Sequence, residues 1–162
     1  MTEKSIEINT AIPTIIACID TTNASESALI YACYIAKSKN FAVQILAVIE
    51  PSHKNLLFGA KAMGNQKRES LEAHLHKLMD IAHKETGIMP TMSVQEGDIV
   101  SEITRKIKRT PNCALLIFGK SNNALSDNVV LPKIVQRIGN KINVPVTIVP
   151  GNLSHEFLEK LV

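Results

Sequence analysis

The sequence predicts one α/β domain in which amphipathic helices cover both faces of an open parallel β-sheet. Two observations lead to this fold class. Five short apolar runs, typical of strands that are buried on both faces, alternate with four helical segments. The chain has 162 residues, of which 45% are hydrophobic, and this suits a single domain with a sizeable core. We therefore expect one domain over residues 1–162, with its core at 13–150 and a C-terminal tail at 151–162.

The first half of the chain predicts two strands joined by a helix. Pro13–Ile19, PTIIACI, is an isoleucine-rich run that fits a buried strand. Asn23–Asn40 fits a helix, because it opens with a pattern similar to a capping box and continues with apolar residues at helical spacing. Ala42–Val48 fits the second strand, and the helix between the two strands predicts a right-handed parallel crossover. Pro51–Gln66 is long for a connection without regular structure, which indicates a functional or a mobile loop.

The second half of the chain repeats this alternation. A stripe of leucines opposite a charged face predicts a helix from Lys67 to the stop signals at Gly87 and Pro90. The remaining segments follow the same apolar patterns. They are a strand at Thr91–Gln95, a helix from Ile99 to before Pro111, a strand at Cys113–Phe118, a helix around Ile134–Ile138, a strand at Val144–Val149 and a short tail helix from Ser154.

Charge and cysteine content exclude several classes of protein. The net charge is only +3 and the charges alternate in sign, so we expect no nucleic-acid partner. The three cysteines lack CxxC spacing and have apolar neighbours, which indicates buried reduced thiols and a cytoplasmic location. The first ten residues have no apolar segment of the kind found in secretory signals. No stretch approaches the roughly 20 apolar residues that a membrane helix needs, so we expect no membrane partner.

The sequence gives no support for catalysis or for a metal site. It contains neither the G-x-S-x-G pattern of a nucleophilic serine nor the HExxH pattern of zinc proteases, so we expect no enzyme activity. His76, Asp80 and His83 fall on one side of the predicted long helix and could approach a metal ion. A solvated helix face explains them more simply, because nothing supplies a fixed fourth ligand. We therefore expect no metal.

The long loop offers two further patterns. Gly59 and Gly64 have the spacing of a P-loop, but Asn65-Gln66 stands where that motif requires Lys-Ser/Thr, so a flexible loop is the simpler interpretation. Leu56–Phe58 is an apolar triplet that either folds back on the core or forms a partner or lid surface.

The segments from Thr14 to Pro150 resemble the universal stress protein family. The opening strand and helix, TIIACIDTTNASESALIYACYIAK, are similar to the family's first strand, its terminal aspartate and the following helix. CALLIFG and NVPVTIVP are similar to its fourth and fifth strands. The resemblance implies a Rossmann-like sheet with strand order 3-2-1-4-5. It also implies that Asp20 and the loop after Gly119 face one crevice, where relatives hold a nucleotide.

The family's phosphate-binding pattern, Gly-x-x-Gly-x9-Gly-Ser/Thr, is degenerate in this chain. Only its first glycine is present, as Gly119, and Asn122, Pro132 and Lys133 stand at the other three positions. Proline has no N–H to donate to a phosphate, and lysine has no hydroxyl. Lys120 and Lys133 could compensate in part as cations. The residues that we assign to a degenerate nucleotide site are Asp20, Val48, Gly119, Lys120, Asn122 and Lys133.

Two functions remain open at this point. The first is a cytoplasmic, non-enzymatic stress-response protein that forms a homodimer, offers surfaces to protein partners, has no cofactor and does not bind ATP tightly. The second is a nucleotide-binding relative that holds ATP or AMP weakly and hydrolyses ATP slowly. The resemblance implies pairing of two copies through the last strand, where Val144, Val146 and Ile148 supply alternating side chains.

Overall fold

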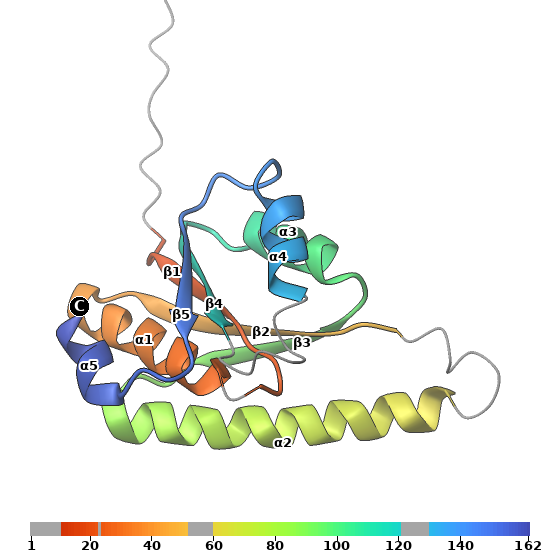
Figure 1. The fold of residues 1–162 in the computed structure, drawn as a ribbon, viewed down its shortest axis with the longest axis horizontal. Coiled ribbons are helices and arrows are strands. Elements are labelled where there is room, and N and C mark those ends of the chain that lie inside the picture. The colour runs from red at the N-terminus through yellow and green to blue at the C-terminus, as the bar shows by residue number, and fades with distance from the viewer. Residues whose placement is uncertain (1–10, 23, 52–59, 121–129) are drawn as a thin grey trace, which may run out of the picture.

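The computed structural model describes residues 11–22, 24–51, 60–120 and 130–162, with backbone alone at 60–64, 130, 132 and 133. Strands and helices alternate from β1 to β5, and a fifth helix follows in the tail (Figure 1). The strands are β1 (Thr14–Cys18), β2 (Ala42–Ile49), β3 (Thr91–Glu96), β4 (Cys113–Lys120) and β5 (Val146–Pro150). The helices are α1 (Ala24–Lys39), α2 (Ala60–Thr86), α3 (Ile99–Arg109), α4 (Val130–Ile138) and α5 (His155–Lys160).

The five strands form one parallel sheet in the order β3-β2-β1-β4-β5. The predicted fold class and the strand order implied by the family resemblance are therefore confirmed. β1 lies at the centre, where Ile16 is paired with Gln44 of β2 on one side and with Leu116 of β4 on the other. Because the chain leaves β1 toward β2 and later returns to its other side, the strand order reverses there, and this reversal opens a crevice beyond the carboxyl ends of β1 and β4.

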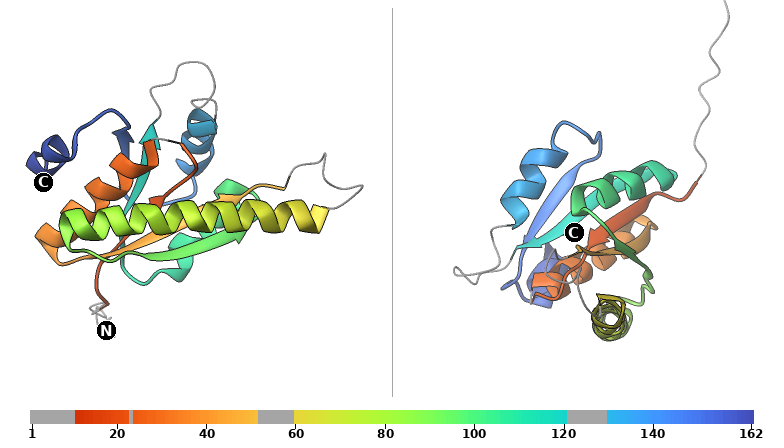
Figure 2. Two further views of the ribbon diagram at one scale, coloured as in Figure 1. Left: turned by 90° about the horizontal axis from the view of Figure 1, so that it is seen from below. Right: turned by 90° about the vertical axis from the view of Figure 1, so that its right-hand side faces the viewer.

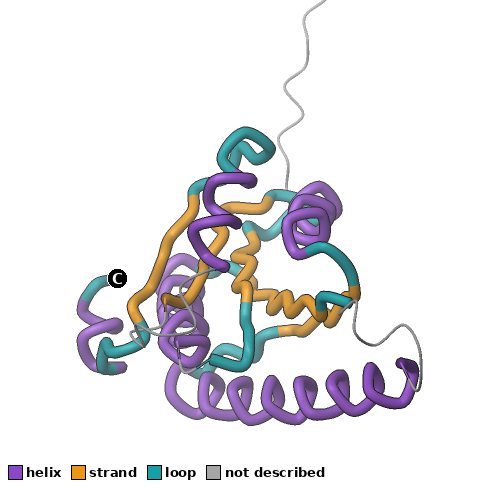
Figure 3. The backbone as a smooth tube through the Cα atoms, turned by 45° about the vertical axis from the view of Figure 1, so that its right-hand side comes forward, coloured by secondary structure: helices purple, strands orange, loops and turns teal. Residues whose placement is uncertain are grey.

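Helices cover the two faces of the sheet unequally. In Figure 1, α3 and α4 lie above the sheet and α1, α2 and α5 lie below it. Figure 3 shows the same arrangement, with the strands between two sets of helices. Successive side chains of β1 point to opposite faces of the sheet. Ile15 packs in the α1, α2 and α5 layer, and Ile16 packs in the α3 and α4 layer. Both isoleucines are fully buried.

The starts of α2, α4 and β5 differ from the prediction. α2 begins at Ala60 and not at Lys67, because the intervening residues are mostly good helix formers and the helix continues through Gly64. Its first turns extend beyond the sheet (Figure 2). α4 begins at Val130, four residues before Ile134. β5 begins at Val146 and not at Val144, because Pro145 has no N–H for the strand ladder.

The tail after β5 folds onto the domain. Ser154 caps α5 by accepting a hydrogen bond from the N–H of Phe157 (3.1 Å). Leu158 is fully buried in the α1 layer. His155 lies 3.0 Å from a carboxylate oxygen of Glu26 in α1, so a polar contact accompanies the apolar one. Among the described residues, no helix combines the length and the apolar character needed to cross a membrane.

Candidate functional site

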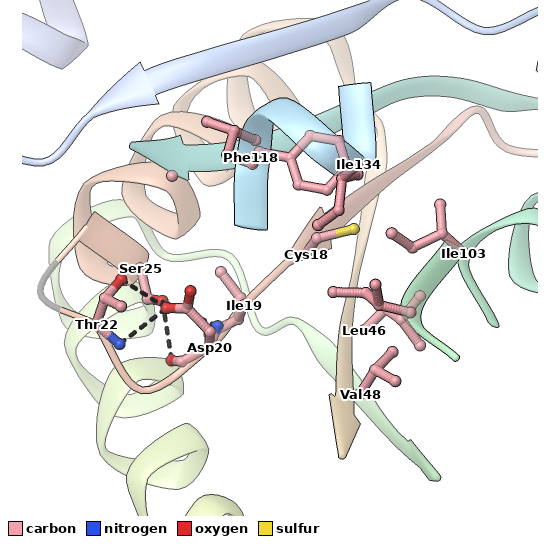
Figure 4. A pocket seen from close by; sticks show the side chains of 13 residues that line it. Cys18, Ile19, Asp20, Thr22, Ser25, Leu46, Val48, Ile103, Phe118 and Ile134 are labelled. Carbon is pink, nitrogen blue, oxygen red and sulfur yellow. Dashed lines mark hydrogen bonds between the residues drawn. The ribbon is translucent and has the colours of Figure 1, made fainter. Parts of the chain in front are cut away.

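The crevice between β1 and β4 contains a cavity of about 80 Å³ (Figure 4). Strand ends supply its inner wall, and α3 and α4 supply the outer wall. In Figure 4 the apolar side chains lie on one side of the cavity, and a polar turn that follows β1 lies on the other. The lining residues are Cys18, Ile19, Asp20, Thr22, Ser25, Leu46, Val48, Ile99, Ile103, Phe118, Gly119, Leu131 and Ile134. The predicted residues Asp20, Val48 and Gly119 are therefore brought together.

The Asp20 carboxylate organises the turn between β1 and α1. Its Oδ1 accepts hydrogen bonds from the N–H (2.8 Å) and the hydroxyl (2.6 Å) of Thr22. The Ser25 hydroxyl lies 2.8 Å from the same Oδ1, and Ser25 Oγ accepts the N–H of Asp20 (3.0 Å). One carboxylate oxygen is thus occupied within the turn, as is usual when aspartate follows a strand. In the described part of the chain, no residue donates to Oδ2.

Gly119 is required by close packing. A Cβ at this position would lie 2.5 Å from the backbone oxygen of Ala24, a distance that real side chains do not adopt. A Cβ on Gly151 would lie 2.8 Å from the Cα of Ala24. The first turn of α1 therefore rests against the ends of both β4 and β5. The first glycine of the degenerate motif has a structural reason to be present that needs no ligand.

The apolar wall of the cavity has no activated nucleophile. Cys18, at the end of β1, lies in this apolar wall together with Ile103, Phe118 and Ile134 (Figure 4). Burial raises the pKa of the Cys18 thiol far above its ordinary value, and the neighbouring Cys113 raises it further. A thiol in this environment remains protonated and packs as a small hydrophobe. Val48 is partly buried and contacts the same apolar layer.

The remaining predicted site residues have different outcomes. Lys120 is exposed at the end of β4, where its backbone oxygen accepts the N–H of Gly151 (2.9 Å). Asn122 lies outside the described residues, as do Leu56–Phe58 and Gly59 of the long loop. Lys133 lies in the first turn of α4, and its side chain is not among those described. Pro132 is the third residue of α4 and therefore lies in its first turn. In anion sites at helix N-termini, the free N–H groups of the first turn bind the anion. Proline has no N–H, so one of these donors is missing here.

A model of the universal stress protein family matches residues 12–150. The chain belongs to this family. The predicted membership is therefore confirmed, and it assigns the chain to a family with a role in the stress response. No curated protein matches the sequence.

Solved structures of universal stress proteins share the fold at low sequence identity. The universal stress protein UspA from Lactobacillus plantarum is 13% identical, with a TM-score of 0.72, over 87% of this chain and 99% of that one. A universal stress protein solved in complex with cAMP is 20% identical, with a TM-score of 0.57, over 88% and 100% of the two chains. A protein from Archaeoglobus fulgidus in complex with dAMP is 12% identical, with a TM-score of 0.57, over 86% and 98%.

Two other patterns in this universal stress protein lie on α2, as far as the structure describes them. Gly64 lies inside α2, so it does not form a turn of a P-loop. His76, Asp80 and His83 are exposed on α2. Among the described residues, no three His, Cys, Asp or Glu side chains are grouped so that they could hold a metal ion.

Sequence reasoning missed Thr22 and Ser25 as residues that shape the site. Their hydroxyls fix the Asp20 carboxylate, although the sequence suggested only that Ser25 matches the family's first helix. A recognisable signal was present, because aspartate followed by hydroxyl residues at the end of a strand favours such a turn.

Proposed function

We propose that the protein is a homodimeric, cytoplasmic and non-enzymatic stress-response protein that acts through protein partners and does not bind ATP tightly. The observation that carries this proposal is the contact between Gly119 and Ala24. The only glycine left from the family's phosphate-binding pattern is explained by packing, because a Cβ at Gly119 would lie 2.5 Å from the backbone oxygen of Ala24. Its presence is therefore no argument for a bound phosphate.

Two further features weaken a triphosphate site. Pro132 removes one N–H from the first turn of α4, where free donors would otherwise favour an anion. Thr22 and Ser25 already donate to Oδ1 of Asp20, so these donors are not free for a phosphate. A ligand in the crevice would therefore meet fewer free donors than the intact family pattern provides, and each lost charge-assisted hydrogen bond costs about 1.5 to 3 kcal/mol.

The dimer and the location rest on other observations. β5 is a sheet edge, and Val146 and Ile148 on it are 41% and 40% exposed, which favours pairing with a second strand. Val144 precedes β5 and packs partly against the α3 and α4 layer, so we assign it a smaller share of the contact.

Cys33 is a free thiol whose burial raises its pKa to about 12, and such unpaired cysteines suit a reducing compartment.

The alternative is weak binding of a nucleotide in the crevice. Two structural neighbours were solved with cAMP and dAMP, and this favours the adenine nucleotides as the ligands to test. Oδ2 of Asp20 could accept a ribose hydroxyl, and exposed Lys120 could contact a phosphate. Slow ATP hydrolysis would require in addition a group that activates water.

Isothermal titration with MgATP, AMP and cAMP tests the proposal. We expect no saturable heat at micromolar nucleotide. Saturable binding that Asp20→Asn and Lys120→Met weaken, and that Lys77→Met on the exposed face of α2 leaves unchanged, would establish the alternative. Asp20→Asn suits this test because the amide oxygen can still accept from Thr22 and Ser25. Gly119 variants do not suit it, because they would displace Ala24 whether or not a ligand binds.

A further inference from the structure

A second hollow lies beside the crevice, between the carboxyl ends of β1 and β2 and the N-terminal half of α2. Its volume is about 530 Å³, against about 80 Å³ for the cavity between β1 and β4. Pockets for small organic ligands usually occupy roughly 300 to 1,000 Å³. The lining residues are Ile19, Asp20, Thr21, Val48, Ile49, Gln66, Lys67, Ser70 and Leu71. The larger space is therefore next to α2 and away from α4, where the degenerate phosphate pattern lies.

The α2 wall of this hollow is fixed to the sheet. Arg68 donates to the backbone oxygen of Val94 in β3 (3.0 Å) and to Glu72 in the next turn of α2 (3.2 Å). Leu71 and Leu75 bury their side chains in the α1 layer. Polar and apolar contacts thus hold this part of α2 in one position, so Lys67 and Ser70 face the hollow from a rigid helix.

The charges at the rim of the hollow are unpaired and opposite in sign. Within the described residues, no carboxylate lies within ion-pair distance of Lys67, and no cation lies within that distance of Asp20. The apolar residues Ile19, Ile49 and Leu71 also line the hollow. A ligand that fits this lining has an anionic group for Lys67, an apolar body for the apolar residues and a hydrogen-bond donor for Asp20.

The charge balance also favours an anion with a single negative charge. One ammonium group can neutralise one carboxylate, whereas a triphosphate would leave several negative charges uncompensated and would meet the Asp20 carboxylate as well. The hollow therefore favours a monoanion over a nucleotide.

We propose that this hollow binds a small monoanionic carboxylic acid that carries a hydroxyl or amino group. Its carboxylate accepts hydrogen bonds from Lys67 and Ser70, and its carbon skeleton lies on the apolar wall. Its hydroxyl or amino group donates to Oδ2 of Asp20, which accepts no hydrogen bond from the described residues. The site shares Ile19, Asp20 and Val48 with the crevice between β1 and β4, but it uses neither the loop after β4 nor α4, where the degenerate phosphate pattern lies.

The probe for this site is 4-hydroxybenzoate, which has a carboxylate and a hydroxyl at opposite ends of an apolar ring. We expect a titration of the ¹⁵N-labelled full chain at millimolar concentrations to shift the amide signals of Asp20, Ile49 and Ser70 saturably. Benzoate, which lacks the donor, and phenol, which lacks the anion, should each bind about tenfold more weakly, since one charge-assisted hydrogen bond is lost in each case.

Variants separate this site from general surface binding. Lys67→Met should raise the Kd for 4-hydroxybenzoate about tenfold, and Ser70→Trp should abolish binding by filling the hollow. Lys77→Met, an exposed lysine on the same helix but outside the hollow, should leave the Kd unchanged. The amide spectrum of each variant reports whether it is folded. Unsaturable shifts, an equal Kd for the Lys67 variant, or shifts confined to Phe118 and Ile134 would overturn the proposal.

Discussion

Arg137 of α4 binds the carboxylate of Asp98, the residue that caps α3, through two parallel hydrogen bonds of 3.1 Å. The same carboxylate accepts the N–H of Ser101 (3.0 Å) and thereby closes the first turn of α3. The two helices that cover one face of the sheet are therefore joined at a single charged residue. The hydrogen bond from Arg137, followed by those from Ser101, lowers the pKa of Asp98 to about 2.

This ion pair should stabilise the protein only where Asp98 is ionised. Because the folded-state pKa is lowered, the stabilisation is present above about pH 4 and is lost as the pH falls toward about 2. Both side chains are about half exposed, so solvent screening limits the effect. We expect Arg137→Met to lower the free energy of unfolding by about 1 kcal/mol at pH 7 and by less near pH 3. Urea denaturation at the two pH values measures this difference, and Arg109→Met is the control for loss of a cation. An equal loss at both pH values would contradict the assignment.

Gly119→Ala should destabilise the fold even though it adds only a methyl group. The new Cβ would overlap the Ala24 backbone, so α1 or β4 must shift, at a cost of about 1 to 3 kcal/mol. Gly139→Ala is the matched control, because its Cβ would lie 3.4 Å from the nearest backbone oxygen, an ordinary contact. Thermal unfolding followed by circular dichroism measures both variants. If Gly119→Ala were as stable as the control, the packing explanation of this glycine would fail.

Leu158→Ala should show that the tail is part of the core. Leu158 is fully buried and Leu161, three residues later, is 50% exposed. Removal of a buried leucine side chain costs about 2 to 5 kcal/mol, whereas the same change at Leu161 should cost much less. Chemical denaturation of the two variants compares them directly. Similar small losses would mean that α5 does not pack on α1 in solution.

Ile148→Lys should convert the proposed dimer into a monomer. A lysine on β5 would place a charge within the strand pairing that joins the two copies. Val135→Lys is the control, because Val135 is similarly exposed but lies on α4, away from the edge strand. Light scattering after size-exclusion chromatography gives the mass of each variant. A wild-type protein that is monomeric at high concentration would exclude the dimer itself.

The sheet could be predicted from the sequence because its strands are buried on both faces. The central residues of β1 (Ile15–Ala17) and of β4 (Leu116–Phe118) are continuous apolar runs that are buried, and such runs are typical of strands covered on both faces. The start of α2 could not be predicted in this way. Two glycines and several polar residues suggested a loop, but helix propensity and the anchoring of Arg68 on β3 favour the longer helix.

The site was only partly predictable for a different reason. Asp20, Val48 and Gly119 could be assigned because the resemblance to the universal stress proteins implied a strand order that brings them to one crevice. The structural role of Gly119 depends on its packing against Ala24, which is far away in the sequence, and no local pattern indicates it. Lys67 and Ser70 reach the second hollow through the placement of α2 against the sheet, which periodicity does not specify.

The unequal covering of the two sheet faces has a consequence for local opening. In the described part of the chain, the face covered by α1, α2 and α5 holds the larger buried cluster, and the face covered by α3 and α4 holds the smaller one. Segments with fewer buried apolar contacts open at lower free energy than the global unfolding. Backbone amides of α4 should therefore exchange with deuterated solvent well before those of α1, and the outer wall of the crevice could separate while the rest of the molecule stays intact.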